Sequence, residues 1–496
     1  MAQARGARRT GRIPIAVSVL GALTLATVSC RRPGPQLATA SLSELRVGLG
    51  QQSATNPLLG LRQLTQILSI EALGRPGEDG RMSPAMAESW EFAGDGRSLT
   101  IKLRSNIRFH DGSPADAATV ASVLPAGMRT FMGPVYSDVE SVKAIGRDAV
   151  SIVFRERSPF LVESLDASVQ KPDGTGTGPF KAVPKSTSEI VSNDDYYLGT
   201  PNIRRIEINS FPSVRSAWAE MLRGRIDMLY EVGPDALPSM QGSNTATIFT
   251  FTRRYQYIVV LNPRAPALKP AEVRRALSMG VDRAEIVRSA LNGYGVVSSG
   301  PIWPKYWASG QNSPDVKYDP AAAANTLGRR LQFTCLVPPD SAFERIALEV
   351  KRQLAAIGVD MKPEQVSFDD LARRAAAGDY EALLIEIISG PTLFRPYLVW
   401  RSNAPFNWGK FGTATSDAAL DRVRRAGSEA EYRTAVSALQ QDFVDNPPAI
   451  FLAWSVRARA VSNRFVVPPI EPGREVTSTL RLWRTGSPDE RRASRN

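Results

Sequence analysis

The chain has 496 residues, of which 43% are hydrophobic and 22% are charged, and its mean hydropathy is −0.19. This composition is typical of a soluble globular protein with two or three packed units, and it argues against a membrane-spanning or disordered chain. The formal net charge of +12 comes from 61 Lys and Arg residues scattered among 49 acidic ones. Since no long basic run occurs, we expect a solvated basic surface and no nucleic-acid partner.

Histidine occurs once, at His110, and cysteine twice, at Cys30 and Cys335. So few ligands exclude a zinc or nickel site built from several imidazoles or thiolates, and we expect no metal and no cofactor. A Ser-His-Asp hydrolase would have to use His110, which stands before an Asp-Gly turn and has the features of a structural histidine. The phosphate-loop, H-E-x-x-H and G-x-S-x-G motifs are missing. We therefore assign no catalytic residue and predict that the protein is not an enzyme.

Residues 1–30 have the pattern of an export signal. Arginines occupy the start of this segment, and an apolar stretch follows from Ile13 to Val28. The stretch is short for a stable membrane span and contains Pro14 and Gly21.

Cys30 ends the leader in a sequence, Thr27-Val28-Ser29-Cys30, that resembles a bacterial lipobox. The motif usually has Leu where Thr27 stands, so ordinary cleavage near Ala38–Ala40 remains the alternative. Residues 31–43 have linker composition and would form a tether, while the polar residues 486–496 predict a disordered tail. We expect the mature protein in the periplasm or at the cell exterior, anchored to a membrane through lipid on Cys30.

The first half of the folded part shows strand patterns. Leu45, Val47 and Leu49 alternate with polar or small residues, and runs at 90–92 and 99–103 flank an Asp-Gly bend that predicts a hairpin. Further alternation is found in two segments: 151–154 and 203–208.

The second half alternates between helix and strand patterns. A helix is predicted over Glu272–Gly280, and Asp282 is placed to cap another helix that continues through Leu291. A strand at 331–337, a helix from 343 to 357 and a strand at 359–361 predict a β-α-β unit with a right-handed crossover.

Several segments resemble one known family. They are Met86–Glu91, Leu99–Arg104, Ile107–Pro114, Gly176–Phe180, Asn193–Tyr197, Leu222–Asp227, Tyr257–Asn262, Val273–Leu277, Val281–Arg283, Tyr318–Pro320, Leu354–Val359 and Ala377–Ala382. In this order and at this spacing they are similar to the bacterial extracellular solute-binding proteins of family 5, the oligopeptide-, dipeptide- and nickel-binding receptors of ABC importers. The resemblance covers roughly 45–482.

This resemblance implies an α/β protein with the periplasmic-binding-protein-like type II fold: two lobes, a hinge, and an extra subdomain on the first lobe. The expected parts are lobe I (44–60, 178–265 and 447–485), the extra subdomain (61–177) and lobe II (266–446). Lobes that close on a ligand bind it without covalent chemistry.

The resemblance also suggests where the ligand binds. The family's loop after the first strand lies at the cleft, which here assigns Gln52, Ser53 and Asn56; an ordinary surface turn is the alternative. Tyr257 and Trp408 offer apolar or stacking surface, and core packing would explain them equally well.

The segment 388–395 is the second predicted contact region, through Ser389, Gly390, Thr392 and Arg395. Peptide-binding members place an aspartate around here for the ligand's amino terminus, but this chain has no carboxylate between Glu386 and Asp417. Arg395 has the opposite charge and would suit a carboxylate or phosphate, unless it is a surface arginine.

The predicted function is that of an extracytoplasmic receptor that delivers a peptide or other small organic solute to the permease of an ABC importer. We expect a monomer. The alternatives are a periplasmic sensor or chaperone clamp without transport, and a periplasmic hydrolase.

Overall fold

The computed structural model describes residues 43–50, 58–186, 188–310, 313–328 and 330–486. The account below concerns the unit Leu42–Asn496 alone. The predicted export signal, Cys30, almost all of the tether, the tail from 487 onward, and the three predicted contacts Gln52, Ser53 and Asn56 lie outside the described residues.

The largest sheet contains eleven of the described strands, in the order β10-β11-β12-β1-β13-β19-β14-β18-β16-β17, with β15 paired to β19. Its strands are β1 (Glu44–Gly50), β10 (Phe180–Ala182), β11 (Glu189–Ser192), β12 (Arg205–Phe211), β13 (Met228–Val232), β14 (Ala246–Leu261), β15 (Gly295–Val297), β16 (Leu331–Val337), β17 (Val359–Gln365), β18 (Ala382–Ile388) and β19 (Ala449–Ser462). β1 pairs in parallel with both β12 and β13, and the face with Leu45, Val47 and Leu49 is buried.

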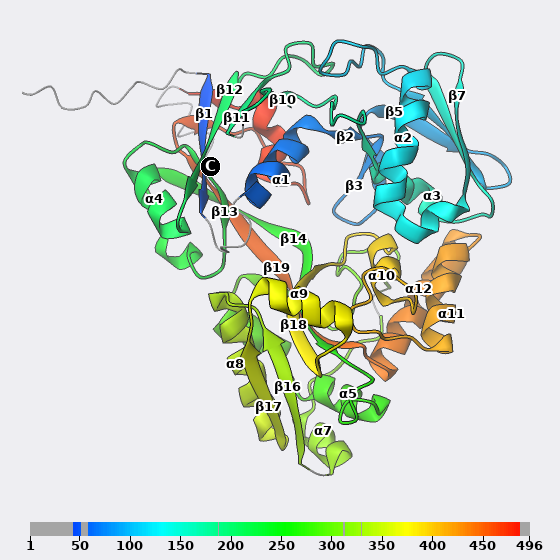
Figure 1. The fold of residues 1–496 in the computed structure, drawn as a ribbon, viewed down its shortest axis with the longest axis vertical. Coiled ribbons are helices and arrows are strands. Elements are labelled where there is room, and N and C mark those ends of the chain that lie inside the picture. Colours follow the sequence, from blue (N-terminus) through cyan, green and yellow to red (C-terminus); the bar gives the residue numbers. More distant parts are fainter. Residues whose placement is uncertain (1–42, 51–57, 187, 311–312, 329, 487–496) are drawn as a thin grey trace, which may run out of the picture. The chain divides into compact units, whose positions relative to one another are not determined.

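The long strands β14 and β19 connect the two halves of this sheet. The end of β19 pairs with β13, whereas residues 255–261 of β14 pair with β18. Figure 1 shows the two strands running side by side between these halves. Their pairing shifts register between Thr252 and Gln256, and such an irregularity twists or bends a strand locally. We call β14 and β19 the crossover strands.

Two hydrophobic clusters form the core of the first half. One gathers around Val47, Ile206 and Trp483, and the other around Ala217 and Leu229. The helices of this half are α1 (Leu58–Ser69) and α4 (Val214–Leu222). Ser213 caps α4 by accepting a hydrogen bond from the backbone N–H of Ser216, which satisfies one of the donors at the start of the helix.

A separate four-stranded sheet, β5-β6-β8-β7, lies within residues 71–169. Its strands are β5 (Ala87–Phe92), β6 (Ser98–Leu103), β7 (Val139–Ile145) and β8 (Ala149–Phe154), and its helices are α2 (Ala117–Met132) and α3 (Phe160–Glu163). Phe92 pairs with Leu99 across the predicted hairpin, which is therefore confirmed. His110 is a structural residue as expected: its Nε2 lies 3.0 Å from the carbonyl oxygen of Gly178, and burial lowers its pKa.

The predicted β-α-β unit is confirmed. β16 and β17 pair in parallel, and α8 (Ser341–Ala356) connects them with one apolar face in the core. Asp282 accepts a hydrogen bond from the N–H of Glu285 as predicted. The helix beyond it is not α-helical throughout: α6 (Arg283–Glu285) gives way to a π-helical turn at Ile286–Ala290. Such a turn widens the spacing of side chains, which the α-helical pattern of the sequence does not indicate.

The described chain also contains four 3₁₀ helices, at Gly133–Asp138, Ser164–Asp166, Leu237–Ser239 and Val476–Leu482. The remaining described β-strands and α-helices are short strands and further helices. They are β2 (Glu71–Ala72), β3 (Gly74–Pro76), β4 (Met82–Pro84), β9 (Ser168–Val169), β20 (Phe465–Val466), β21 (Arg484–Thr485), α5 (Ala271–Met279), α7 (Pro320–Leu327), α9 (Phe368–Ala377), α10 (Phe394–Trp400), α11 (Ala414–Arg425) and α12 (Glu429–Asp445).

One hydrophobic core is continuous between residues 73–169 and 302–454. It includes Leu124 and Phe160 from the first segment and Phe394, Leu420 and Trp454 from the second. Cys335, within the parallel strands, is a free and buried thiol. Among the described helices, none combines the length and the apolar character needed to cross a membrane.

Candidate ligand-binding cleft

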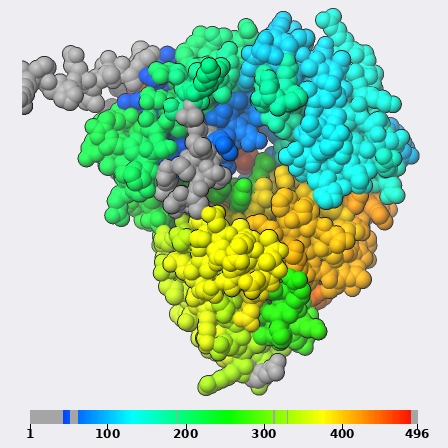
Figure 2. Space-filling view, viewed as in Figure 1, coloured from blue at the N-terminus to red at the C-terminus, as the bar shows by residue number. Residues whose placement is uncertain are grey.

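A cavity of about 370 Å³ lies against the crossover strands. Its walls come from the segment 77–78, from both crossover strands, from residues 296–305 with Pro391, and from residues 473–474. It is therefore lined by the crossover strands themselves, by the segment 71–169 and by later segments that lie outside both halves of the sheet or in the short strand β15. Figure 2 shows a hollow on one face between the segments coloured blue and green and those coloured yellow. We call the cavity the cleft.

Two tryptophans form an apolar wall of the cleft. The rings of Trp303 and Trp454 pack edge to face with centroids 4.7 Å apart, and the indole N–H of Trp303 donates to the carbonyl oxygen of Glu78 at 2.8 Å. The indole nitrogen of Trp454 is buried and has no hydrogen-bond partner among the described residues. Aromatic surface of this kind is common in ligand sites.

Three arginines gather at the cleft. Arg254 and Arg474 line it. Arg395 lies nearby: burial is the main cause that lowers the pKa of Arg395, and the positive charge of Arg254 lowers it further. Burial, together with the charges of Arg75 and Arg254, lowers the pKa of Arg474 to about 10. Like charges are thus held near one another in partly buried positions.

Only one carboxylate, Asp166, faces all three of these arginines within the described residues. Its oxygen lies 4.0 Å from the guanidinium of Arg254. Burial raises the pKa of Asp166 although the three arginines lower it. Neither Arg395 nor Arg474 makes a side-chain hydrogen bond or an ion pair within the described part of the chain. The guanidinium of Arg395 packs over the ring of Phe131 at 4.7 Å.

A second charged group, by contrast, is fully paired. Arg457 lies 3.3 Å from Glu231 and 3.3 Å from Glu386, and Arg253 lies 3.3 Å from Glu386. These residues come from β13, both crossover strands and β18, so the network ties together the strands where the two halves meet. Arg457 also donates to the hydroxyl of Tyr257 at 2.8 Å.

Tyr257 and Trp408, predicted as ligand contacts, do not line the cleft. The side chain of Tyr257 is fully buried in the core beside Phe343. Trp408 is half-buried against a hydrophobic core, and its carbonyl oxygen accepts the hydroxyl of Tyr380. Core packing accounts for both residues, and their contact with a ligand remains a prediction.

The predicted segment 388–395 borders the cleft, but most of its polar groups have partners within the protein. The backbone N–H groups of Ser389 and Gly390 both donate to the carbonyl oxygen of Arg254, and the Ser389 hydroxyl donates to the carbonyl oxygen of Pro301. The Thr392 hydroxyl bonds to the carboxyl group of Glu163. These residues shape the site, and Arg395 alone among them has an unpaired polar group.

Gly390 is required by close packing. A β-carbon at this position would lie 3.1 Å from two ring atoms of Trp454 and 3.3 Å from the ring of Trp303. A side chain at this position would therefore require the tryptophan rings to shift by a few tenths of an ångström.

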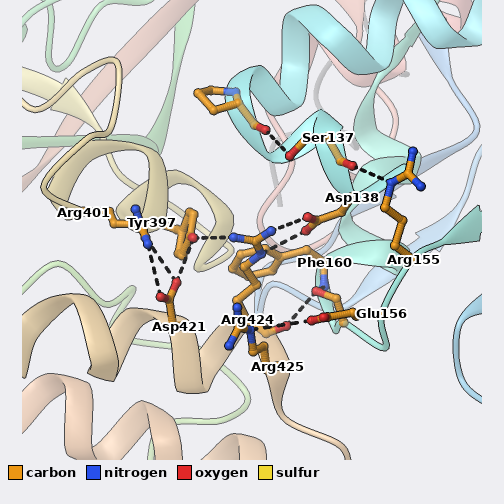
Figure 3. A network of polar contacts seen from close by, with 12 residues as sticks. Ser137, Asp138, Arg155, Glu156, Phe160, Tyr397, Arg401, Asp421, Arg424 and Arg425 are labelled. Carbon is orange, nitrogen blue, oxygen red and sulfur yellow. Dashed lines mark hydrogen bonds and ion pairs between the residues drawn. The ribbon is translucent and has the colours of Figure 1, made fainter. Parts of the chain in front are cut away.

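A zone of direct contact between residues 131–163 and 392–425 lies outside the cleft, and we call it the closure zone. Figure 3 shows its polar part. Arg424 donates to both carboxylate oxygens of Asp138, one at 2.9 Å, and to the hydroxyl of Tyr397 at 2.6 Å. That hydroxyl donates in turn to Asp421 at 2.9 Å. All these charges are paired.

Aromatic rings form the apolar part of the closure zone. The ring of Phe394 stacks on Phe131 with centroids 5.0 Å apart and packs edge to face with Phe160 at 5.3 Å. Glu163 lies beside them and accepts the backbone N–H of Phe394 at 3.1 Å. Burial raises the pKa of Glu163 to about 8.

A second cavity, of about 530 Å³, adjoins the closure zone and is lined by Trp307, Tyr432 and Glu163. No crossover strand lines it, and so it is less suited than the cleft to couple ligand binding to movement between the halves. In the described part of the chain, no three His, Cys, Asp or Glu residues come together to hold a metal ion.

Sequence reasoning missed Arg254, Arg474, Trp303 and Trp454. One signal was present: Arg253 and Arg254 are consecutive charges in a strand whose neighbours are aromatic or β-branched. Two consecutive strand residues face opposite sides, so at least one of these charges had to point away from solvent.

Curated proteins match much of the chain. A probable D,D-dipeptide-binding periplasmic protein of Escherichia coli is 24% identical over 60% of this chain and 63% of its own length. An oligopeptide-binding protein of Bacillus subtilis is 21% identical over 80% of this chain and 83% of its own. Both are named as binding proteins.

Solved structures define the class. NikZ from Campylobacter jejuni, in complex with Ni(L-His), matches with a TM-score of 0.77 and 21% identity over 90% of this chain and 100% of its own. The protein AgaA of A. tumefaciens, in complex with agropinic acid, matches with a TM-score of 0.73 and 18% identity over 90% and 99%. The chain therefore has the two-lobed type II fold of periplasmic binding proteins, as predicted.

The family follows from the sequence. The sequence model of one protein family, the bacterial extracellular solute-binding proteins of family 5 (middle region), matches residues 81–408. The chain belongs to this family, which confirms the resemblance found in its motifs.

Proposed function

We propose that the protein is the extracytoplasmic receptor of an ABC importer, which captures a peptide or other small organic solute between two lobes and delivers it unchanged to a membrane permease. The cleft carries this proposal, because its wall combines residues of the proposed lobe I, the extra subdomain and lobe II, and it rests on the two strands that connect the halves of the sheet.

The arrangement of strands supports a hinge. Among the described strands, β19 pairs with β13 of one half, β14 pairs with β18 of the other, and the two pair with each other. We place the bend at their register shift, between residues 252 and 256. A ligand that touches both halves stabilises the closed arrangement by its differential affinity for that state. We place lobe I at 44–60, 178–265 and 447–485, the extra subdomain at 61–177 and lobe II at 266–446.

The absence of catalysis is part of the proposal. His110 bonds to a backbone carbonyl oxygen and does not line the cleft, and the cleft's charged side chains are cations and the paired Glu78. These groups bind and orient a solute but supply no activated nucleophile. We also propose that the protein acts as a monomer outside the cytoplasm and is anchored through lipid on Cys30.

A ligand screen with product analysis tests the proposal. The exported chain would be heated with peptides, sugars, opines or metal chelates, and the solute would then be recovered for mass spectrometry. At least one class should raise the melting temperature, since a ligand at a hundred times its Kd adds about 2.7 kcal/mol, and it should be recovered intact. A chemically altered solute would point to an enzyme, and a screen in which no class stabilises the chain would contradict the receptor function.

A further inference from the structure

The cleft has more positive charge than its own carboxylates balance. Its lining includes Arg254, Lys305 and Arg474 but only one acidic residue, Glu78. Glu78 forms an ion pair with Lys305, which leaves the two arginines as the unbalanced charges of the wall.

The neighbouring carboxylates are already engaged with other partners. Glu471 lies 3.6 Å from Arg75, and Glu475 lies 2.7 Å from Arg459. Asp166, at 4.0 Å from Arg254, is the one acidic group shared by Arg254, Arg395 and Arg474. Glu471 and Glu475 also attract Arg474, but each is paired with another arginine, so Asp166 is the one carboxylate common to the three cations.

Such an arrangement is costly in the absence of a ligand. Like charges in a partly buried site repel one another more strongly than in water, and an unpaired guanidinium loses hydration that nothing in the described chain replaces. Guanidinium groups bind carboxylate and phosphate oxygens in a planar fork that suits both anions. A negative group in the cleft would remove the repulsion and supply the missing hydrogen bonds.

We propose that the solute carries a carboxylate or phosphate group, which Arg254 and Arg474 bind in the cleft while Arg395 adds a third positive charge nearby. This inference rests on the proposed receptor function and narrows its ligand to an anion. The tryptophan wall gives the rest of the molecule an apolar surface, and the unpartnered indole N–H of Trp454 is available as one more donor after a small rearrangement. The cleft volume of about 370 Å³ restricts the bound part to a small organic group.

The first test uses the ligand-free protein. Arg474→Gln removes a charge that has no hydrogen bond or ion pair within the described residues. If the arginine is held there for a ligand, its loss should leave the melting temperature unchanged or higher. A clear fall in the melting temperature of a variant that folds normally by circular dichroism would mean that the arginine stabilises the fold, and the proposal would be overturned.

The second test compares related peptide probes of different charge, of which the negative and the neutral one are matched in shape. The full chain would be titrated calorimetrically, at constant ionic strength, with N-acetyl-trialanine (negative), its amide (neutral) and trialanine amide (positive). Citrate and inorganic phosphate would be added as carboxylate and phosphate arms. At least one anionic probe should bind at least tenfold more tightly than the neutral amide, and Arg254→Gln/Arg474→Gln should remove this preference. Whether the carboxylate probes or inorganic phosphate bind shows which of the two anions the cleft recognises.

A matched control separates the cleft from net charge. Arg97→Gln/Arg223→Gln also removes two positive charges. Both side chains are exposed, and among the described residues their ion pairs are with Glu140 and Glu220, while Arg97 also donates to the carbonyl oxygen of Phe154. Its affinities should stay within twofold of the wild type.

The two hypotheses fail differently in this experiment. If neutral or positive probes bind the wild type and the arginine variant alike, the receptor function stands and the anionic ligand is wrong. If no probe of any charge binds, and the wider screen of peptides, sugars, opines and chelates is also negative, both proposals are wrong.

Discussion

The arginine side chains of the cleft and of the closure zone differ in whether they have partners within the protein. In the closure zone Arg424 donates to Asp138 and Tyr397, and Arg401 pairs with Asp421. In the cleft Arg474 has no such partner within the described chain. Both regions are partly buried and join distant segments, so burial alone does not explain the difference.

The contrast indicates what each region is for. Paired charges and stacked rings hold two segments together. Unpaired buried cations destabilise the ligand-free protein, and they are retained where a bound group supplies the missing negative charge. The predictions below test whether the closure zone provides stability as this comparison requires, and they run from the largest expected effect to the smallest.

Removing the central ring of the closure zone should have the largest effect. Phe394 is fully buried between Phe131 and Phe160, and Phe394→Ala should lower the free energy of unfolding by about 3–5 kcal/mol, measured by urea denaturation. Phe406→Ala is the control, because Phe406 is 47% exposed and its loss should cost less than about 1 kcal/mol. Equal losses in the two variants would show that the rings do not form a common core.

The buried carboxyl group of Glu163 should make stability depend on pH. Its pKa rises from an ordinary 4.5 to about 8 on folding, so between these values the unfolded chain loses the proton and the folded chain keeps it. The contribution of this group is complete below pH 4.5, falls as pH rises, and is lost above about pH 8.

Glu163→Gln should remove this dependence. Relative to the wild type, the variant should gain at most about 1.4 kcal/mol of unfolding free energy for each pH unit between 5 and 8, measured by urea denaturation at four pH values. Glu140→Gln, at a side chain 47% exposed, serves as the control and should follow the wild type. Parallel curves for wild type and Glu163→Gln would contradict a neutral Glu163.

The ion pair of Asp138 and Arg424 should contribute a smaller amount. Their side chains are 20% and 19% exposed, so Asp138→Asn and Arg424→Gln should each cost about 2 kcal/mol. A double-mutant cycle on the free energy of unfolding should give a coupling of about 1–2 kcal/mol. Additive losses would mean that the pair does not stabilise the closure zone.

The neighbouring pair of Arg425 and Glu156 should contribute least. The two charges are 3.8 Å apart, and the side chains are 63% and 74% exposed. Arg425→Ala should therefore change the free energy of unfolding by less than about 0.5 kcal/mol in the same denaturation experiment. A loss as large as that of Arg424→Gln would remove the distinction between buried and exposed pairs in this zone.

Local structure followed the sequence closely wherever short-range patterns decide it. The hairpin around Asp95 and Gly96, the cap at Asp282 and the parallel pair of β16 and β17 formed as predicted. The π-helical turn at Ile286–Ala290 did not, because its spacing depends on packing against β15 and α8 and not on the local pattern.

The sequence by itself determined the elements, the family and the excess of positive charge. It could not determine which charges remain unpaired, because that depends on segments far apart in the chain: Arg254 meets Asp166 and Arg474 only after folding. For the same reason Tyr257, which matched an expected ligand contact, lies in the core, while Trp454 reaches the cleft. Burial and pairing are properties of the folded surroundings, and only the tertiary structure decides them.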